Sequence, residues 1–231
     1  MISTGGQTGN RIELVVFDLD GTLVDSRKDL ADATNAVLLE FGGQPLPEDE
    51  IVAMVGEGAE MLVRRALATA GLEAAPPGAL ERFLVVYDDR LLDHTGPYPG
   101  MTATLDALAA DRALAVLTNK PLAATVRILD ALDLRRHFGG VVGGDSPWGR
   151  KPDPGGLLHL AREAGVPPAR TLLVGDSAVD LETARRSGAR ICLCRYGFGY
   201  RFAPEAFRGD EWFIDEPPAL LRLLGAASGT P

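Results

Sequence analysis

The chain has 231 residues, of which 46% are hydrophobic and 24% are charged. At about 150 residues per domain, this length predicts one large domain or a core with a smaller companion. The composition is that of a globular protein and excludes a disordered, collagen-like or coiled-coil chain. The 23 Lys and Arg residues are outnumbered by 32 Asp and Glu residues, which gives a formal net charge of −9. This charge repels polyanions, so it argues against nucleic acid and anionic membrane surfaces as partners.

The cysteine usage and the N-terminal segment predict a cytoplasmic protein. Cys192 and Cys194 stand in a C-x-C spacing on one face of a predicted strand, and this spacing provides neither a disulfide framework nor a zinc motif. Residues 1–11 lack the basic and apolar segments of a signal peptide. The sequence also has no run of about 18 apolar residues, so no transmembrane helix is expected. Whether the protein is a monomer or a homodimer is left open by the sequence.

The first predicted element is a strand at residues 14–17. Its four residues are all apolar, and the run ends abruptly at Asp18. A short, continuous apolar run is typical of a strand buried on both faces, as in a parallel sheet covered by helices.

Residues 26–94 follow this strand and contain no further strand-like run. Helical spacing of apolar residues begins after Ser26, a candidate N-cap, and stops at Gly42. Further helices are predicted at 48–55, 59–70 and 78–93. We therefore expect an all-helical module at 26–94, inserted between the two segments of a core domain at 1–25 and 95–231.

From residue 95 onward, strand-like and helix-like stretches alternate. Strands are expected at 113–117, 141–142, 171–174 and 190–194. Helices are expected at 102–110, 121–132, 156–164 and 178–187. This alternation predicts an α/β fold with a doubly wound, Rossmann-like parallel sheet.

Polar residues follow the predicted strands, at the edge where an open parallel sheet binds its ligands. These residues are Asp18, Asp20, Gly21, Thr22, Thr118, Asn119, Lys120, Lys151, Asp176 and Asp180. Several carboxylates in one pocket repel one another unless a cation is present, and hard oxygen donors suit Mg²⁺. A lysine and a hydroxyl at the same edge would hold the oxygens of a phosphoryl group during its transfer. The spacing therefore predicts magnesium-assisted phosphoryl transfer.

The same residues resemble the four ordered motifs of the haloacid dehalogenase superfamily. Residues 18–26 resemble the first motif, D-x-D-G-T, while Thr118, Lys151 and residues 175–180 resemble the second, third and fourth. The helical segment 26–94 lies where a type 1 cap belongs. The resemblance spans nearly the whole chain, and it implies a Rossmann-like core with an inserted all-helical cap domain.

The resemblance also implies a role for each motif residue. Asp18 would be the nucleophile that forms an aspartyl-phosphate, and Asp20 would protonate the leaving alcohol and then activate water. Mg²⁺ would be held by Asp18, the Asp20 backbone carbonyl and Asp176, with Asp180 as a ligand or beside one. The phosphoryl group would be bound by Gly21, Thr22, Thr118, Asn119 and Lys151. The presence of the acid Asp20 favours phosphate esters as substrates, because relatives that cleave halides or phosphonates lack an acid at the corresponding position.

Substrate choice is expected to depend on the cap. Residues 55–59 and 62–67 resemble the cap of bacterial phosphoglycolate phosphatases, which implies hydrolysis of 2-phosphoglycolate, a small phosphorylated metabolite. Gly56, Glu57 and Gly58 would then contact the substrate. The role of Arg64 and Arg65 stays open. Either side chain could meet a substrate carboxylate, but on a helix we expect both to face solvent. The role of loop 197–201 at the active edge stays open as well.

Three alternatives to this function remain. One is a phosphosugar mutase similar to β-phosphoglucomutase, which would use the same aspartate and a bisphosphate intermediate. Another is a phosphatase that acts on a different small phosphorylated metabolite. The third is a phosphate-sensing module without turnover, against which the intact pair of Asp18 and Asp20 argues, since binding alone does not need the outer acid.

Overall fold

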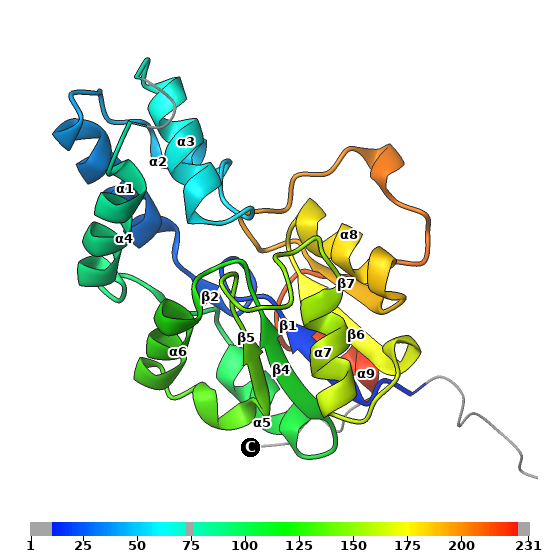
Figure 1. The fold of residues 1–231 in the computed structure, drawn as a ribbon. Helices are drawn as coiled ribbons and strands as arrows, with labels where there is room; N and C mark the ends of the chain where they lie inside the picture. The colour runs from blue at the N-terminus through cyan, green and yellow to red at the C-terminus, as the bar shows by residue number, and fades with distance from the viewer. Residues whose placement is uncertain (1–10, 73–75, 226–231) are drawn as a thin grey trace, which may run out of the picture.

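The computed structural model describes residues 11–72 and 76–225. Its core is a six-stranded sheet with the strand order β5-β4-β1-β6-β7-β8, in which each neighbouring pair is parallel (Figure 1). The strands are β1 (Leu14–Phe17), β4 (Ala113–Leu117), β5 (Gly140–Val142), β6 (Thr171–Gly175), β7 (Arg190–Cys194) and β8 (Trp212–Ile214). The predicted doubly wound, Rossmann-like α/β fold is confirmed.

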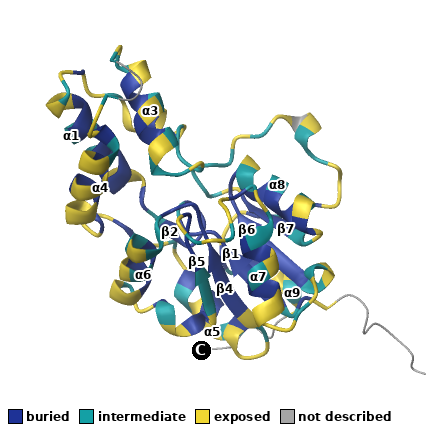
Figure 2. Cartoon of the chain, viewed as in Figure 1, coloured by how far each residue is buried: buried dark blue, intermediate teal, exposed yellow. Residues whose placement is uncertain are grey.

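Strand β1 lies between β4 and β6 and is buried on both faces, as its continuous apolar run predicts (Figure 2). Val15 and Phe17 belong to one hydrophobic core, whereas Leu14 and Val16 belong to a second. Helices α5 (Met101–Ala109), α6 (Leu122–Ala131) and α9 (Ala219–Leu224) contribute to the first core. Helices α7 (Gly155–Glu163) and α8 (Ala178–Ser187) contribute to the second. Packing on both faces fixes the carboxyl end of β1, where Asp18 follows.

Four helices separate β1 from the rest of the sheet and gather to one side of it (Figure 1). They are α1 (Arg27–Glu40), α2 (Glu48–Val52), α3 (Ala59–Thr69) and α4 (Ala79–Arg90). The chain enters and leaves this group through a two-stranded antiparallel ribbon of β2 (Val24–Asp25) and β3 (Gly96–Pro97). The buried Asp29 carboxylate accepts hydrogen bonds from the backbone N–H and the hydroxyl of Thr95, which ties α1 to the return of the chain. The division into a core and a cap at 26–94 stays a prediction.

The structure contains short elements that the sequence pattern does not predict. These are the ribbon strands β2 and β3, the edge strand β8, helix α9, and single 3₁₀ turns at Arg135–His137, Pro168–Arg170 and Pro204–Ala206. Ser26 stands at the predicted N-cap position of α1, but its side chain makes no capping hydrogen bond. Its hydroxyl instead donates to Oδ1 of Asp20 at 2.6 Å.

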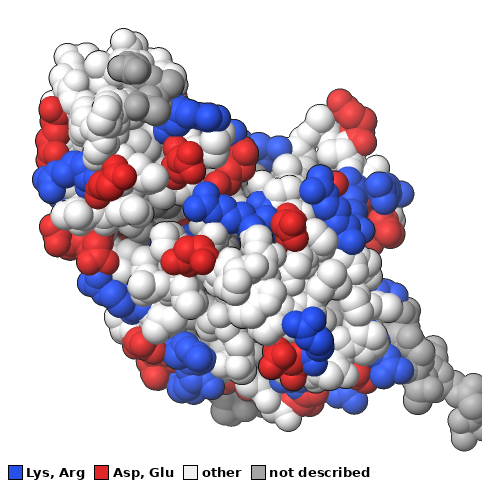
Figure 3. All heavy atoms as spheres, in the orientation of Figure 1, with Lys and Arg blue, Asp and Glu red and all other residues white. Residues whose placement is uncertain are grey.

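The charged side chains of both signs are interspersed over the face shown in Figure 3. The acidic side chains on this face are therefore not collected in one region. Within the described residues, every helix is too short or too polar to pass through a bilayer.

Candidate active site

Three buried carboxylates meet at the carboxyl edge of the sheet. Asp18 follows β1, Asp176 follows β6, and Asp180 stands in the first turn of α8. Each offers an oxygen, and these three oxygens lie within 4.8 Å of one another. The ammonium of Lys151 lies 2.8 Å from Oδ1 of Asp18 and 2.6 Å from Oδ1 of Asp180. Residues more than 150 positions apart thus form one cluster.

The electrostatics of this cluster favour a bound cation. Burial raises the pKa of Asp18 from 3.8 to about 6, an effect that Lys151 opposes and Asp180 reinforces. Burial also raises the pKa of Asp176 well above its ordinary value, and repulsion from Asp180 and Asp18 adds to it. Burial alone would lower the pKa of Lys151, yet attraction to Asp18 and Asp180 raises it. Three carboxylates with one ammonium and hard oxygen donors fit a divalent cation such as Mg²⁺.

Asp180 has a structural task as well as a place in the cluster. It forms a capping box with Ser177, whose backbone N–H and hydroxyl donate to Oδ2 of Asp180 at 3.0 and 2.5 Å. Gly175 gives this carboxylate room, since a Cβ at that position would lie 2.3 Å from the Asp180 Cγ. Asp180 therefore belongs both to the N-terminal capping box of α8 and to the carboxylate cluster, because its Oδ2 accepts from Ser177 while its Oδ1 contacts Lys151.

The Asp20 carboxylate is held apart from the three clustered carboxylates. The ammonium of Lys120 lies 2.8 Å from Oδ1 and 2.7 Å from Oδ2 of Asp20, and the Ser26 hydroxyl donates to the same group. The predicted role of the Asp20 backbone carbonyl as a metal ligand stays a prediction. The Asp20–Lys120 contact is the one feature of the site that the sequence analysis missed most clearly, although Lys120 directly follows Thr118 and Asn119.

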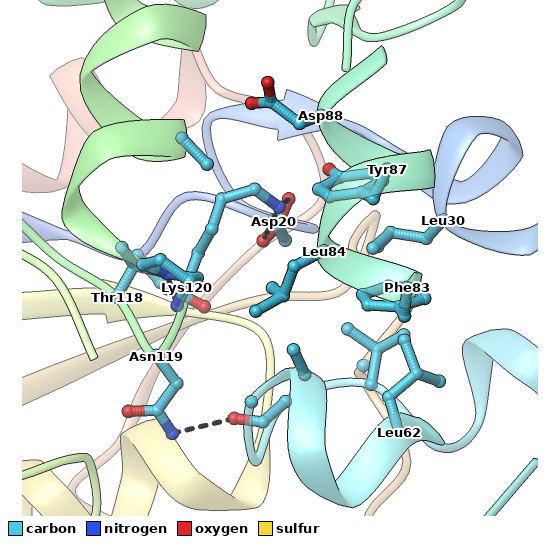
Figure 4. Close-up of a pocket in the computed structure, with 18 of the residues that line it drawn as sticks. Asp20, Leu30, Leu62, Phe83, Leu84, Tyr87, Asp88, Thr118, Asn119 and Lys120 are labelled. Carbon is cyan, nitrogen blue, oxygen red and sulfur yellow. Dashed lines mark hydrogen bonds and ion pairs between the residues drawn. The ribbon is translucent and has the colours of Figure 1, made fainter. Parts of the chain in front are cut away.

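The residues after β4 link the sheet edge to the helical module. The amide nitrogen of Asn119 donates to the backbone carbonyl of Gly56 at 2.9 Å, the dashed line in Figure 4. It also donates to the backbone carbonyl of Lys151 at 2.9 Å. The Oδ1 of Asn119 and the hydroxyl of Thr22 are both buried, and neither has a hydrogen-bond partner among the described residues. The buried Thr118 hydroxyl accepts from the backbone N–H of Lys120 at 3.2 Å. Both amide N–H groups of Asn119 are thus engaged, and its Oδ1 can only accept hydrogen bonds. The predicted phosphoryl-binding role of Asn119 stays a prediction, and it would require the backbone N–H as donor.

Loop 197–201 supports Asp176. The backbone N–H of Gly199 donates to Oδ2 of Asp176 at 2.7 Å. Gly21 has a φ of +85°, and a Cβ there would lie 2.0 Å from the same oxygen. A Cβ at Gly197 would lie 2.3 Å from the Asp176 Cβ. These glycines allow backbone to close around the carboxylate. The G-x-G spacing after the last predicted strand was the available signal for this role.

A cavity of about 440 Å³ opens between the sheet edge and the helical module (Figure 4). The sheet edge contributes Asp18, Asp20, Thr118, Asn119, Lys120 and Asp176. The helical module contributes an apolar wall that includes Leu30, Leu62, Phe83, Leu84 and Tyr87. Gly56 and Gly58 also line the cavity, whereas the Glu57 carboxylate pairs with Arg65 at 2.5 Å. The cavity therefore joins the carboxylate cluster to a largely apolar space.

Comparison with known proteins agrees with this geometry. Residues 15–194 match the family described as haloacid dehalogenase-like hydrolase. The chain belongs to this family, which confirms the resemblance seen in the motifs.

Individual relatives cover most of the chain. It is 40% identical over 220 residues to a phosphoglycolate phosphatase of Pseudomonas fluorescens, covering 92% of this chain and 80% of that protein. It is 43% identical over 219 residues to a phosphoglycolate phosphatase of Rhodospirillum rubrum, covering 91% and 90%. A crystal structure of a predicted phosphoglycolate phosphatase from Haemophilus somnus superposes with a TM-score of 0.85 at 31% identity, covering 94% of this chain and 99% of that one.

Proposed function

We propose that the chain is a Mg²⁺-dependent phosphomonoester hydrolase that converts 2-phosphoglycolate to glycolate and phosphate. The observation that carries this proposal is the cluster of Asp18, Asp176 and Asp180 around Lys151, with Asp20 beside it and a cavity above. The names of relatives at 40% and 43% identity supply the substrate.

In the first half-reaction, an oxygen of Asp18 attacks phosphorus while the bond from phosphorus to the ester oxygen breaks. Asp20, protonated at this stage, gives its proton to the departing oxygen. In the second half-reaction, Asp20 takes a proton from water as that water attacks phosphorus. The bond from phosphorus to Asp18 then breaks, which releases inorganic phosphate and restores the carboxylate.

The surrounding residues compensate the charge of the phosphoryl group. Lys151 keeps Asp18 oriented through its 2.8 Å contact and offsets negative charge in the transition state. The Thr118 hydroxyl and the polar groups of Gly21, Thr22 and Asn119 are proposed to bind phosphoryl oxygens. The metal would be held by Asp18, the Asp20 carbonyl, Asp176 and Asp180, and it would supply positive charge that offsets the charge of the phosphoryl group.

Residues 26–94 are proposed to act as the cap. The cavity walls from α1, α3 and α4 are mostly apolar, which suits the exclusion of water from the acyl-phosphate. The Asn119 amide holds the Gly56 carbonyl of the cap loop against the sheet edge. A cytoplasmic location stays a prediction, as does the choice between monomer and homodimer.

The test is phosphate release by purified protein from 2-phosphoglycolate and from a panel of other phosphorylated metabolites, ranked by kcat/KM. We expect 2-phosphoglycolate to rank first and Asp18→Asn to abolish release. Formation of an isomer from a sugar phosphate, without net phosphate release, would identify a mutase instead. Binding of phosphate without turnover of any ester would identify a sensing module.

A further inference from the structure

The proposed substrate carries a carboxylate as well as a phosphate, and this second anion needs a cationic partner in a chain of net charge −9. Among the described residues that line the cavity, Lys120 alone has a cationic side chain. The remaining wall is apolar on the side of the helical module, apart from Asp88 and Asp89, which would repel a carboxylate. Arg127 pairs with Asp88 from outside the set of lining residues.

The cap arginines are engaged elsewhere. Arg65 pairs with Glu57 at 2.5 Å and donates to the Met54 carbonyl at 3.3 Å. Arg64 is not among the residues that line the cavity, and its guanidinium lies 3.1 Å from the Met61 sulfur. Neither arginine is therefore placed to meet a ligand in the cavity.

Lys120 is held in a defined position between Asp20 and Tyr87. Its side chain is 4% exposed, and two of its contacts go to the two oxygens of Asp20. The ammonium lies 4.7 Å from the centroid of the Tyr87 ring on α4. An ammonium has three N–H donors. Two hydrogen bonds to Asp20 leave the third, for which a ligand carboxylate would compete with the neighbouring Tyr87 side chain.

We propose that Lys120 recognises the carboxylate of the substrate and so determines specificity for phosphorylated hydroxy acids. This inference rests on the proposed function, because it takes Asp20 as the group that protonates the ester oxygen. In 2-phosphoglycolate, the carboxylate carbon is two bonds from that oxygen. A substrate with its ester oxygen against Asp20 therefore brings its carboxylate beside the ammonium that contacts Asp20.

The experiment compares kcat/KM for 2-phosphoglycolate with kcat/KM for ethyl phosphate, which lacks the carboxylate. Wild type, Lys120→Met, Lys120→Arg and the control Arg64→Met are measured side by side, with circular dichroism to check folding. The ratio of the two kcat/KM values is the readout, because a disturbance of Asp20 lowers both values and cancels in the ratio. We expect Lys120→Met to lower the ratio about 10- to 100-fold, as for loss of a charged hydrogen bond.

Lys120→Arg is expected to retain part of the preference, and Arg64→Met to retain all of it. An unchanged ratio in folded Lys120→Met would overturn the inference while leaving the proposed function in place. So would loss of the preference in Arg64→Met. A wild-type enzyme with no preference for 2-phosphoglycolate would instead overturn the proposed substrate, and the inference with it. If Lys120→Met does not fold, the Lys120→Arg ratio decides: a ratio equal to that of wild type contradicts the inference, and a reduced ratio supports it.

Discussion

The ionised carboxylate of Asp18 is expected to destabilise the metal-free fold at neutral pH. Burial raises its pKa from 3.8 to about 6, and one pKa unit corresponds to about 1.4 kcal/mol. Holding Asp18 ionised therefore costs the folded state about 3 kcal/mol above pH 6. Asp18→Asn replaces the carboxylate with a neutral group of the same shape and retains the contact of Lys151 with Asp180. We expect this variant to be more stable than wild type in the absence of metal.

The sign of the effect follows from the direction of the pKa change. The pKa of Asp18 is higher in the folded state than in the unfolded state. Its contribution to the free energy of unfolding is therefore fully present below pH 3.8 and is lost as the pH rises through about 6. The advantage of Asp18→Asn should thus be below about 1 kcal/mol at pH 4 and reach its full size of about 3 kcal/mol by pH 7. Urea unfolding in EDTA at a series of pH values measures it, with the exposed Asp93→Asn as a matched control expected to stay within about 0.5 kcal/mol of wild type.

Addition of Mg²⁺ completes the experiment. Wild type should gain stability at pH 7.5, because the proposed metal would bind the folded state and not the unfolded one. Asp18→Asn should gain less, because it lacks one of the proposed ligands. A variant no more stable than wild type at pH 8 in EDTA would refute the reasoning. The same holds for a difference that does not grow between pH 4 and pH 7, since burial would then not control the ionisation of Asp18.

Three other outcomes follow from the site. EDTA should remove phosphatase activity and Mg²⁺ should restore it; activity that persists in EDTA contradicts the metal assignment. Gly21→Ala should lower kcat at least about 100-fold, because its Cβ would lie 2.0 Å from Asp176 Oδ2. The matched control is Gly42→Ala: Gly42 has a φ of +84°, close to the +85° of Gly21, but a Cβ there has no atom of the described chain within 4 Å. The control should therefore show the effect of backbone strain alone. Lys151→Met should lower kcat at least about 100-fold, measured with saturating 2-phosphoglycolate, and near-normal turnover would show that Lys151 does not act on the transition state.

Much of the sheet was predictable because a buried parallel strand requires a continuous apolar run. Strands β1, β4, β6 and β7 are four or five residues long, and a polar residue follows each of them in the sequence. Because parallel strands share one carboxyl edge, the proximity of Asp18 and Asp176 follows from the strand pattern alone. Strand β8 (Trp212–Ile214) was missed, although the equally short edge strand β5 (Gly140–Val142) was predicted. Between β7 and β8 the described chain has only a 3₁₀ turn and no α-helix, so β8 does not fit the alternation of strands and helices.

The side-chain contacts were less predictable than the strand ends. Ser26 was expected to cap α1, and its position at the helix start is correct, but its hydroxyl donates to Asp20. Helix-start preferences describe local backbone, whereas the partner of a hydroxyl depends on which distant carboxylate the fold brings near. The contact between Lys120 and Asp20 spans 100 positions and has no local signature. The sequence around a lysine does not show whether its side chain faces solvent or pairs with a buried carboxylate.

The two lysines reduce the negative charge of the site without cancelling it, because two ammonium groups meet four carboxylates. Lys151 contacts Asp18, the proposed nucleophile, and also Asp180, while Lys120 contacts Asp20, the proposed acid. Both lysine side chains are at most 4% exposed, where charges interact more strongly than they do across water. Charges spread over the surface are screened within about 10 Å at ordinary salt. The local groups therefore control the potential at the cavity more than the net charge of −9 does, and binding of an anion there also calls for the proposed metal.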